Sequence, residues 1–173
     1  MVKGMQDRIF TEVDLVQNKC LGAFLIFKTV QSYEAHELNK AGCPLLLLFL
    51  VLPILYQKDI TTILCSTQIA SGIRKFSGKF SSIDEKKSDL ILRIHDLAGS
   101  YKALTWQSVV LCMRSNMLAI IPESALVVSK MQNIPKKYEC SSIKPMINGA
   151  SRLGAWFAKN SLYEIALNLK VRF

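Results

Sequence analysis

The chain has 173 residues, a length that allows one domain with at most a small appendage and excludes several full-sized domains. Half of the residues are hydrophobic and only 20% are charged, a balance that supports a large core and favours further apolar surface buried against a partner. The net charge is +9, and residues 101–173 carry ten lysines and arginines against three acidic residues. This basic C-terminal half favours a polyanionic partner, such as nucleic acid, or an acidic protein surface. A general solubilising excess of cations is the alternative.

The cysteines favour a reducing compartment. They are five in number and widely spaced, without a Cys-x-x-Cys pair, and no histidine lies at metal-ligand spacing. Most lie in apolar segments, where a free cysteine behaves as a small hydrophobic residue. We therefore expect a cytoplasmic protein without a metal or cofactor. The first ten residues lack the apolar core of a secretory signal, and we expect residues 1–16 to form a loose segment before a single helical domain over 17–173.

The first predicted helix covers residues 18–38, with Asn18 as a suitable N-cap. The stretch is apolar on nearly every face as far as Phe27. It then becomes amphipathic, and Val30 and Tyr33 continue the buried side. The first half of this helix is therefore expected to lie deep in the core.

The rest of the chain is organised around the apolar run PLLLLFLVLPILY, from Pro44 to Tyr56. Each buried aliphatic side chain contributes roughly 1.5–3 kcal/mol only when water is removed from it, so this run has to be covered on all sides. A membrane span needs about 20 apolar residues, whereas this run is shorter and is interrupted by Pro53. We interpret it as a helix buried in the core of a soluble protein. A membrane span is the alternative.

The segment after the apolar run predicts a short helical turn and two helices. The sequence DITTIL is the turn. Ser66 or Thr67 opens the first helix, and Ser82 or Asp84 caps the second, which ends at Gly99. The second helix carries an apolar stripe formed by Leu90, Ile91, Ile94, Leu97 and Ala98.

Residues 84–131 carry the most informative local pattern. A helix is predicted after Gly99, and two β-branched runs, LAII and ALVVSK, follow it with Pro-Glu-Ser between them, which predicts a hairpin near 117–130. Two helices followed by a hairpin is the order of a winged helix-turn-helix. The predicted fold is therefore mainly α, a single compact helical domain around a buried apolar helix, with a winged-helix-like hairpin. The expected apolar stripe of the helix before the hairpin comprises Trp106, Val109, Val110, Met113 and Met117.

Two helices are predicted at the C-terminal end. One covers about 143–159, with Pro145 in its first turn, where proline is tolerated. The other is SLYEIALNL. The closing KVRF is a candidate for an added extended strand.

The sequence shows no set of catalytic residues. It contains neither a GxxxxGK[ST] nor a GxGxxG phosphate loop, so ATP binding by this chain alone is not expected. His36 is expected to be solvated, and His95 and Asp96 are helical neighbours that point apart and do not form a relay. Cys43 precedes a buried helix, a poor setting for a reactive thiolate. We therefore expect no enzymatic activity.

The basic residues support a second hypothesis, contact with nucleic acid. Phosphate contacts need only cations at the surface. Sequence readout needs Arg, Asn or Gln aimed at base edges, and the helix before the hairpin has few of them. DNA contact is therefore expected to be non-specific, and a scattered basic surface without a dedicated site is the alternative. The candidate contacts are Lys102, Arg114, Lys130, Lys136, Lys137, Lys144 and Arg152.

Three stretches together resemble a known family. They are NKCLGAFLIFKTVQSYEAHE, CPLLLLFLVLPILYQKDITTILCSTQ and RLGAWFAKNSLYEIALNLKVRF. They are similar to the family's opening Asn-x-x-x-Gly-Ala helix, to its leucine-rich run with Leu-Pro-Leu and a following Ser-Thr helix start, and to its closing Leu-Gly-x-Trp-Phe-Ala segment. The family is the middle component of the ABC-three-component systems of prokaryotes, which include the Lamassu defence systems. The resemblance covers about residues 11–173, and Gln57-Lys58-Asp59 departs from the His-Lys-Pro often found there.

The resemblance implies a non-catalytic adaptor. In such systems an SMC/Rad50-like ABC ATPase supplies the nucleotide chemistry and a separate effector, often a nuclease, supplies the damage. The middle component is expected to bind the ATPase and to couple it to the effector in anti-phage or anti-plasmid defence. One alternative is a stand-alone winged-helix DNA-binding regulator. Another is a small membrane-associated protein anchored through residues 44–56.

Overall fold

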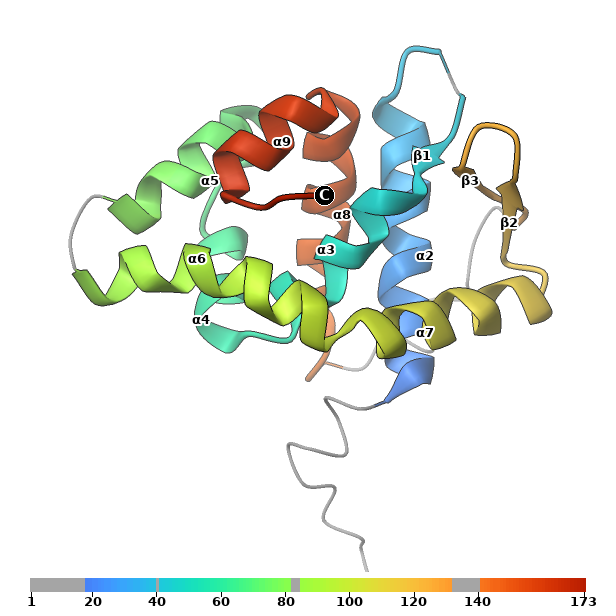
Figure 1. The fold of residues 1–173 in the computed structure, drawn as a ribbon, viewed down its shortest axis with the longest axis horizontal. Coiled ribbons are helices and arrows are strands. Elements are labelled where there is room, and N and C mark those ends of the chain that lie inside the picture. Colours follow the sequence, from blue (N-terminus) through green and yellow to red (C-terminus); the bar gives the residue numbers. More distant parts are fainter. Residues whose placement is uncertain (1–17, 40, 82–84, 132–140) are drawn as a thin grey trace, which may run out of the picture.

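The computed structural model describes residues 18–39, 41–81, 85–131 and 141–173 as a mainly helical domain with a small antiparallel sheet at one side (Figure 1). It confirms the predicted fold class. The expected loose segment 1–16 and the candidate caps Ser82 and Asp84 lie outside the described residues. The elements in chain order are α2 (Lys19–His36), β1 (Cys43–Pro44), α3 (Leu45–Leu55), α4 (Lys58–Cys65), the 3-10 turn η1 (Ile69–Ser71), α5 (Gly72–Ser81), α6 (Glu85–Ser100), α7 (Lys102–Arg114), β2 (Leu118–Ile121), β3 (Leu126–Ser129), α8 (Lys144–Ala158) and α9 (Leu162–Leu169).

Helix α2 begins where the sequence predicts because Asn18 caps it. The side-chain oxygen of Asn18 accepts hydrogen bonds from the backbone N–H groups of Cys20, at 2.9 Å, and Leu21, at 3.2 Å. Leu25 and Phe27, which lie on nearly opposite sides of the helix, are both completely buried. Helices α8, α7 and α3 pack against α2, which is therefore the centre of the domain.

Helices α2 and α8 pack with their backbones in close approach at Gly154. A Cβ atom at this position would lie 2.3 Å from the carbonyl oxygen of Thr29 and 2.8 Å from the nitrogen of Tyr33, so only glycine fits. Nearby, the hydroxyl of Ser32 donates a hydrogen bond to the carbonyl oxygen of Ser151 at 2.5 Å. This contact joins two helices that are far apart in the sequence.

The apolar run forms α3, and most of it is buried, as predicted. Leu48 is completely buried, whereas Leu46 is 48% exposed, so one flank of the helix is left uncovered. The hydroxyl of Thr61, on α4, lies 3.2 Å from the carbonyl oxygen of Ile54 and 2.9 Å from that of Leu55 and donates to them. It satisfies acceptors that the end of a helix leaves unpaired.

The described helices differ from a membrane span in length. No single one of them is long and apolar enough to cross a membrane, and α3 itself has 11 residues. Helices α3 and α4 reach the required length and composition only as a pair, and that pair is bent by 104° at its break.

The predicted hairpin is present, and a third strand joins it. Strands β2 and β3 pair antiparallel, with Leu118 opposite Ser129 and Ile121 opposite Leu126. The two-residue β1 pairs with the other side of β3, which gives the strand order β1-β3-β2. A strand of two residues has no periodic signal, and the sequence pattern does not predict it.

Helices α6 and α7 do not form the turn of a helix-turn-helix. Tyr101 alone separates them, and they follow one another nearly end to end along one side of the domain (Figure 1). A helix-turn-helix needs a turn of about three or four residues between helices that cross at about 90–120°. Helix α6 also runs to Ser100, one residue past the predicted end at Gly99. The hairpin is therefore confirmed, but the structure does not show a winged helix over 84–131.

The buried face of α7 differs from the predicted one. Trp106 and Met113, which were expected in the core, are 46% and 42% exposed. Small side chains are required on the buried face because α7 crosses α2 at Gly22, where a Cβ atom would lie 2.4 Å from the hydroxyl of Ser108. Hydrophobicity alone therefore predicts Val109 correctly but places Trp106 and Met113 on the wrong side of the helix. The buried side chains of α7 are Thr105, Ser108, Val109 and Cys112.

The boundaries between α4 and α5 also differ from the prediction. The sequence DITTIL belongs to a complete helix, α4. The next helix does not begin at Ser66 or Thr67, because the hydroxyl of Thr67 donates backwards to the carbonyl oxygen of Ile63 at 2.8 Å. The turn η1 intervenes, and α5 starts at Gly72, whose φ of +73° favours glycine.

Helices α8 and α9 form as predicted, but the closing tail adds no strand. Pro145 lies in the first turn of α8. Ser161 and Glu164 form a reciprocal capping box at the start of α9. Lys170 has a left-handed φ of +53°, which ends α9, and Val171 is buried. The sheet β1-β3-β2 contains no residue of this tail.

Replacing Gly154 with alanine is expected to destabilise the fold by about 1–3 kcal/mol, because the added methyl group overpacks the contact between α2 and α8. Gly78→Ala is the matched control. A Cβ atom at Gly78 meets nothing within 4 Å, and alanine there is expected to stabilise α5 by up to about 1 kcal/mol. Urea denaturation followed by circular dichroism measures the free energy of unfolding of both variants. Equal stability of the Gly154→Ala variant and the wild type would contradict the close approach.

The substitution of threonine by valine is expected to have different effects at two buried sites. The hydroxyl of Thr105 has no hydrogen-bond partner among the described residues, whereas that of Thr61 is bonded to α3. Thr105→Val is expected to leave the free energy of unfolding unchanged or to raise it by about 1 kcal/mol, because it removes an unpaired buried group. Thr61→Val leaves acceptors of α3 unpaired and is expected to cost about 1–3 kcal/mol. Thermal denaturation of the two variants compares them, and an equal loss in both would refute this assignment.

Candidate functional site

One flank of α3 is not covered by the rest of the described domain. A groove runs there between α3, the junction of α6 and α7, and the C-terminal tail. It consists of two adjoining hollows of about 330 and 620 Å³ that share Phe49, Gly99 and Lys102. We call this surface the apolar groove and define it by six lining side chains, Leu46, Phe49, Ala98, Lys102, Trp106 and Phe173.

Large apolar side chains line the groove without being buried. Leu46, Trp106 and Phe173 are 48%, 46% and 51% exposed. The rings of Phe49 and Trp106 are stacked, with 6.3 Å between their centroids and 15° between their planes. This stack holds the indole of Trp106 against α3. The exposed apolar area is left in contact with water, a condition that favours burial against a partner.

The C-terminal tail is fastened at the end of the groove by one buried side chain and two backbone hydrogen bonds. Val171 is 5% exposed, and its N–H donates to the carbonyl oxygen of Ala166 at 3.1 Å. The N–H of Arg172 donates to Nδ1 of His95 at 3.4 Å. These contacts position Phe173 against the groove, a role of His95 that the sequence does not reveal.

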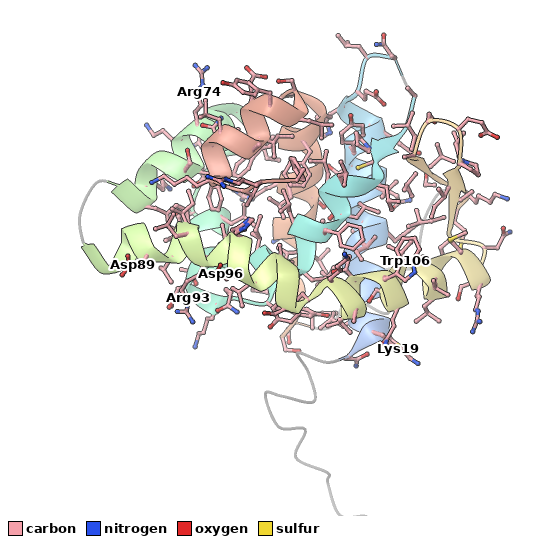
Figure 2. All side chains as sticks on the ribbon, viewed as in Figure 1. Lys19, Arg74, Asp89, Arg93, Asp96 and Trp106 are labelled. Carbon is pink, nitrogen blue, oxygen red and sulfur yellow. The ribbon has the colours of Figure 1, made fainter. Side chains whose placement is uncertain are left out.

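Cations line part of the groove and the hollow beyond it. Lys102 and Arg172 line its first hollow. Beyond Trp106, a third hollow of about 200 Å³ is lined by Lys19 and Arg114 among others, and Figure 2 shows Lys19 and Trp106 near each other around α7. No described aspartate or glutamate lines any of the three hollows. The apolar surface is therefore bordered by positive charge.

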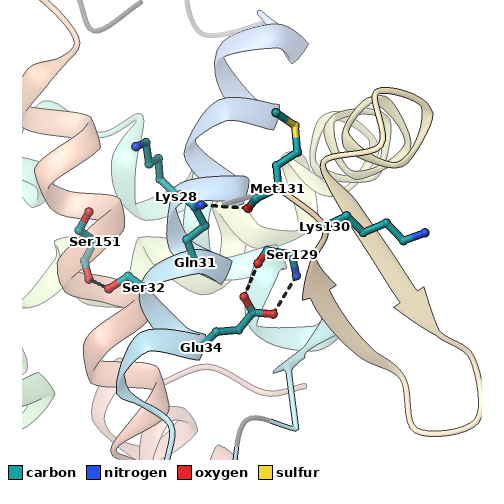
Figure 3. Close-up of a pocket in the computed structure, with 8 residues that line it drawn as sticks. All are labelled: Lys28, Gln31, Ser32, Glu34, Ser129, Lys130, Met131 and Ser151. Atoms are coloured by element: carbon teal, nitrogen blue, oxygen red, sulfur yellow. Dashed lines mark hydrogen bonds between the residues drawn. The ribbon is translucent and has the colours of Figure 1, made fainter. Parts of the chain in front are cut away.

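A separate polar pocket of about 650 Å³ lies between α2, α8 and the end of β3 (Figure 3). Its polar groups bond to one another. The carboxylate of Glu34 accepts hydrogen bonds from the hydroxyl of Ser129 and from its backbone N–H, the latter at 2.8 Å. The amide of Gln31 donates to the carbonyl oxygen of Met131 at 3.2 Å. These bonds tie β3 to α2, and they give Glu34 a structural role.

A comparison with protein families identifies what kind of chain carries these surfaces. The family model described as "ABC-three component (ABC-3C) system Middle Component 3" matches residues 6–173. The chain belongs to this family. Neither a curated protein nor a solved structure matches it. The family assignment confirms the resemblance to a middle component and implies that the protein has partner subunits.

The described candidates for nucleic-acid contact on this middle component come from different elements. Lys102 and Arg114 are exposed on α7 and line hollows that meet at Trp106. Lys130 lines the polar pocket instead, and Lys144 lies in the first turn of α8. The structure therefore places Lys102 at the groove and Arg114 at the hollow beyond Trp106, and it places Lys130 and Lys144 elsewhere.

Arg152 fastens a neighbouring turn. It is half-buried on α8, and its guanidinium donates a hydrogen bond to the carbonyl oxygen of Thr67. This bond gives Arg152 a structural role that the sequence does not indicate. Lys136 and Lys137 lie outside the described residues, and DNA contact by any of the candidates stays a prediction.

The thiols of the middle component differ in exposure. Cys20 is exposed, whereas Cys43 and Cys112 are completely buried. Burial raises the pKa of Cys112 to about 12, and burial together with the nearby carboxylates of Glu34 and Glu37 raises the pKa of Cys43. A raised pKa lowers the reactive thiolate fraction at neutral pH. The described residues contain no group of three or more His, Cys, Asp or Glu that could hold a metal ion.

Maleimide labelling of the native middle component at pH 8 is expected to modify Cys20 rapidly and to spare Cys43 and Cys112 until urea unfolds the chain. Peptide mass spectrometry at fixed times measures each site, and Cys20→Ser is the control. Rapid native labelling of Cys112 would contradict its buried position.

The folded pKa of Cys112 lies above its ordinary value of 9.0. The free energy of unfolding should therefore be constant below about pH 9 and fall as the pH rises towards 12.

Proposed function

We propose that this middle component is a non-catalytic adaptor that couples an SMC/Rad50-like ABC ATPase to an effector subunit, such as a nuclease. The assembly would act in the cytoplasm, in prokaryotic defence against phages or plasmids of the Lamassu type. The observation that carries the proposal is the match of residues 6–173 to a middle component of an ABC-three component system.

The surface of the domain supports an adaptor role. The apolar groove exposes the Phe49–Trp106 stack, and a tryptophan that becomes buried on binding is a common anchor of protein interfaces. Glu34 and His95 are engaged in hydrogen bonds that hold the fold, and the two buried thiols are protonated at neutral pH. This supports a division of roles in which other subunits carry the chemistry.

A stand-alone winged-helix regulator gains no support from the arrangement of α6 and α7. Contact with DNA enters the proposal only as non-specific phosphate binding, for which Lys102 and Arg114 are exposed on α7.

Co-expression of the tagged chain with the proteins encoded beside it tests the proposal. The expected result is a stable assembly that contains an ABC ATPase with a long coiled coil, with its mass determined by light scattering after size exclusion. The same purification from cells that express the tag alone is the control. A folded chain that elutes alone while those proteins are present would contradict the adaptor role.

A further inference from the structure

We propose that the apolar groove binds an amphipathic helix of a partner subunit whose polar side is acidic. The inference rests on the proposed function only in that the helix belongs to a subunit of the same assembly. It adds the site on this chain and the chemistry of the segment that occupies it.

The shape of the groove fits one side of a helix. Its walls come from α3, α6, α7 and the tail, and large apolar side chains are presented by three of them: Leu46 on α3, Trp106 on α7 and Phe173 on the tail. The two hollows adjoin along this line, so apolar side chains spaced at i, i+3 or i+4, and i+7 on a partner helix would occupy them in succession. The Phe49–Trp106 stack at their junction is the expected anchor, because large aromatic side chains near the centre of an interface carry much of the binding energy.

The charge around the groove selects an acidic helix. Lys102 and Arg172 line the groove, and Lys19 and Arg114 line the hollow beyond Trp106. No described carboxylate side chain lines these hollows. A partner helix that carries Asp and Glu beside its apolar stripe would meet this border with complementary charge, which favours association and fixes its orientation.

Two acidic residues of α6, Asp89 and Asp96, lie outside the lining of the groove. Figure 2 labels Asp89, Arg93 and Asp96 on α6, and none of the three lines the groove. Neither Asp89 nor Asp96 therefore lines the surface on which an acidic partner would bind.

Two other occupants fit the groove less well. A single-stranded nucleic acid uses cations and open aromatic faces, but here Phe49 stacks on Trp106, and aliphatic groups of Leu46, Leu50 and Val171 line much of the remainder. A second copy of this chain carries the same net charge of +9, so it would bring like charges together at the groove. A partner helix avoids the first conflict through its apolar stripe and the second through its acidic residues.

Photo-crosslinking in the assembled complex tests the proposal directly. Ala103, which is exposed and lines the groove beside Trp106, is replaced by p-benzoylphenylalanine in the full chain, and the complex purified from the co-encoded genes is irradiated. The expected product joins this position to a partner segment with helically spaced apolar residues and flanking Asp or Glu. Cross-links to DNA, to a second copy of this chain or to a basic segment, or the lack of any cross-link, would overturn the proposal.

Affinity measurements separate an anchor from an indirect effect on folding. Trp106→Ala is expected to weaken binding of the cross-linked subunit by about thirtyfold. Lys102→Glu combined with Arg114→Glu is expected to weaken it by about tenfold, and reversing the facing acid of the partner to lysine should restore much of the loss. The matched controls are Tyr163→Ala on α9 and Arg74→Glu combined with Lys75→Glu on α5, all exposed and away from the groove. Circular dichroism checks that each variant is folded.

The outcomes distinguish this inference from the proposed function. Failure of the wild-type chain to assemble with the co-encoded subunits would remove the adaptor role together with its proposed binding site. Assembly of the wild type and of the groove variants with equal affinity would leave the adaptor role standing and would refute the groove as its binding site.

Discussion

The close approach of α2 and α8 is the contact on which the rest of the domain depends. At Gly154 the backbone of α8 lies against the carbonyl oxygen of Thr29, so the two helices cannot move apart without opening the core. Helix α2 is apolar around most of its circumference, and α8, α7 and α3 have to cover it from different sides. The position of α2 between them decides where each of the other elements can lie.

The position of α7 explains why the apolar groove exists. Because Gly22 brings α7 close to α2, only small side chains such as that of Ser108 fit between these helices. The same orientation turns Trp106 towards the flank of α3, where it stacks on Phe49. One tight helix contact inside the domain therefore produces an exposed aromatic stack outside it. The core and the candidate binding surface have a common cause.

Much of the fold is readable from the sequence because its signals are local. The cap at Asn18, the apolar run of α3, the hairpin and the proline in the first turn of α8 are all where simple rules place them. The predictions that are wrong concern features set by tertiary contacts. The stripe of Trp106 and Met113 was expected in the core, and it lies outside because a glycine in another helix decides which face of α7 is buried. No periodicity within α7 contains that information.

The candidate site was harder to predict than the fold for the same reason. Its lining side chains come from α3, from the junction of α6 and α7, and from a tail fastened through His95. Among the basic residues predicted as contacts, Lys102 lines this surface, Arg114 lines the hollow beyond Trp106, and Arg152 holds a turn instead. The number of charges predicts a basic face. It does not tell which of the cations are already hydrogen-bonded within the domain.

The long separation between α2 and α8 also has a consequence for how the chain folds as it is synthesised. The contact between Ser32 and Ser151 closes a loop of 119 residues. Helix α8, which covers α2, therefore leaves the ribosome long after α2 itself. Until then the apolar sides of α2 and α3 lack their native neighbour, and contacts this distant in sequence form slowly. The nascent chain therefore passes through a period of exposed hydrophobic surface, in which dependence on chaperones and a tendency to aggregate are greatest.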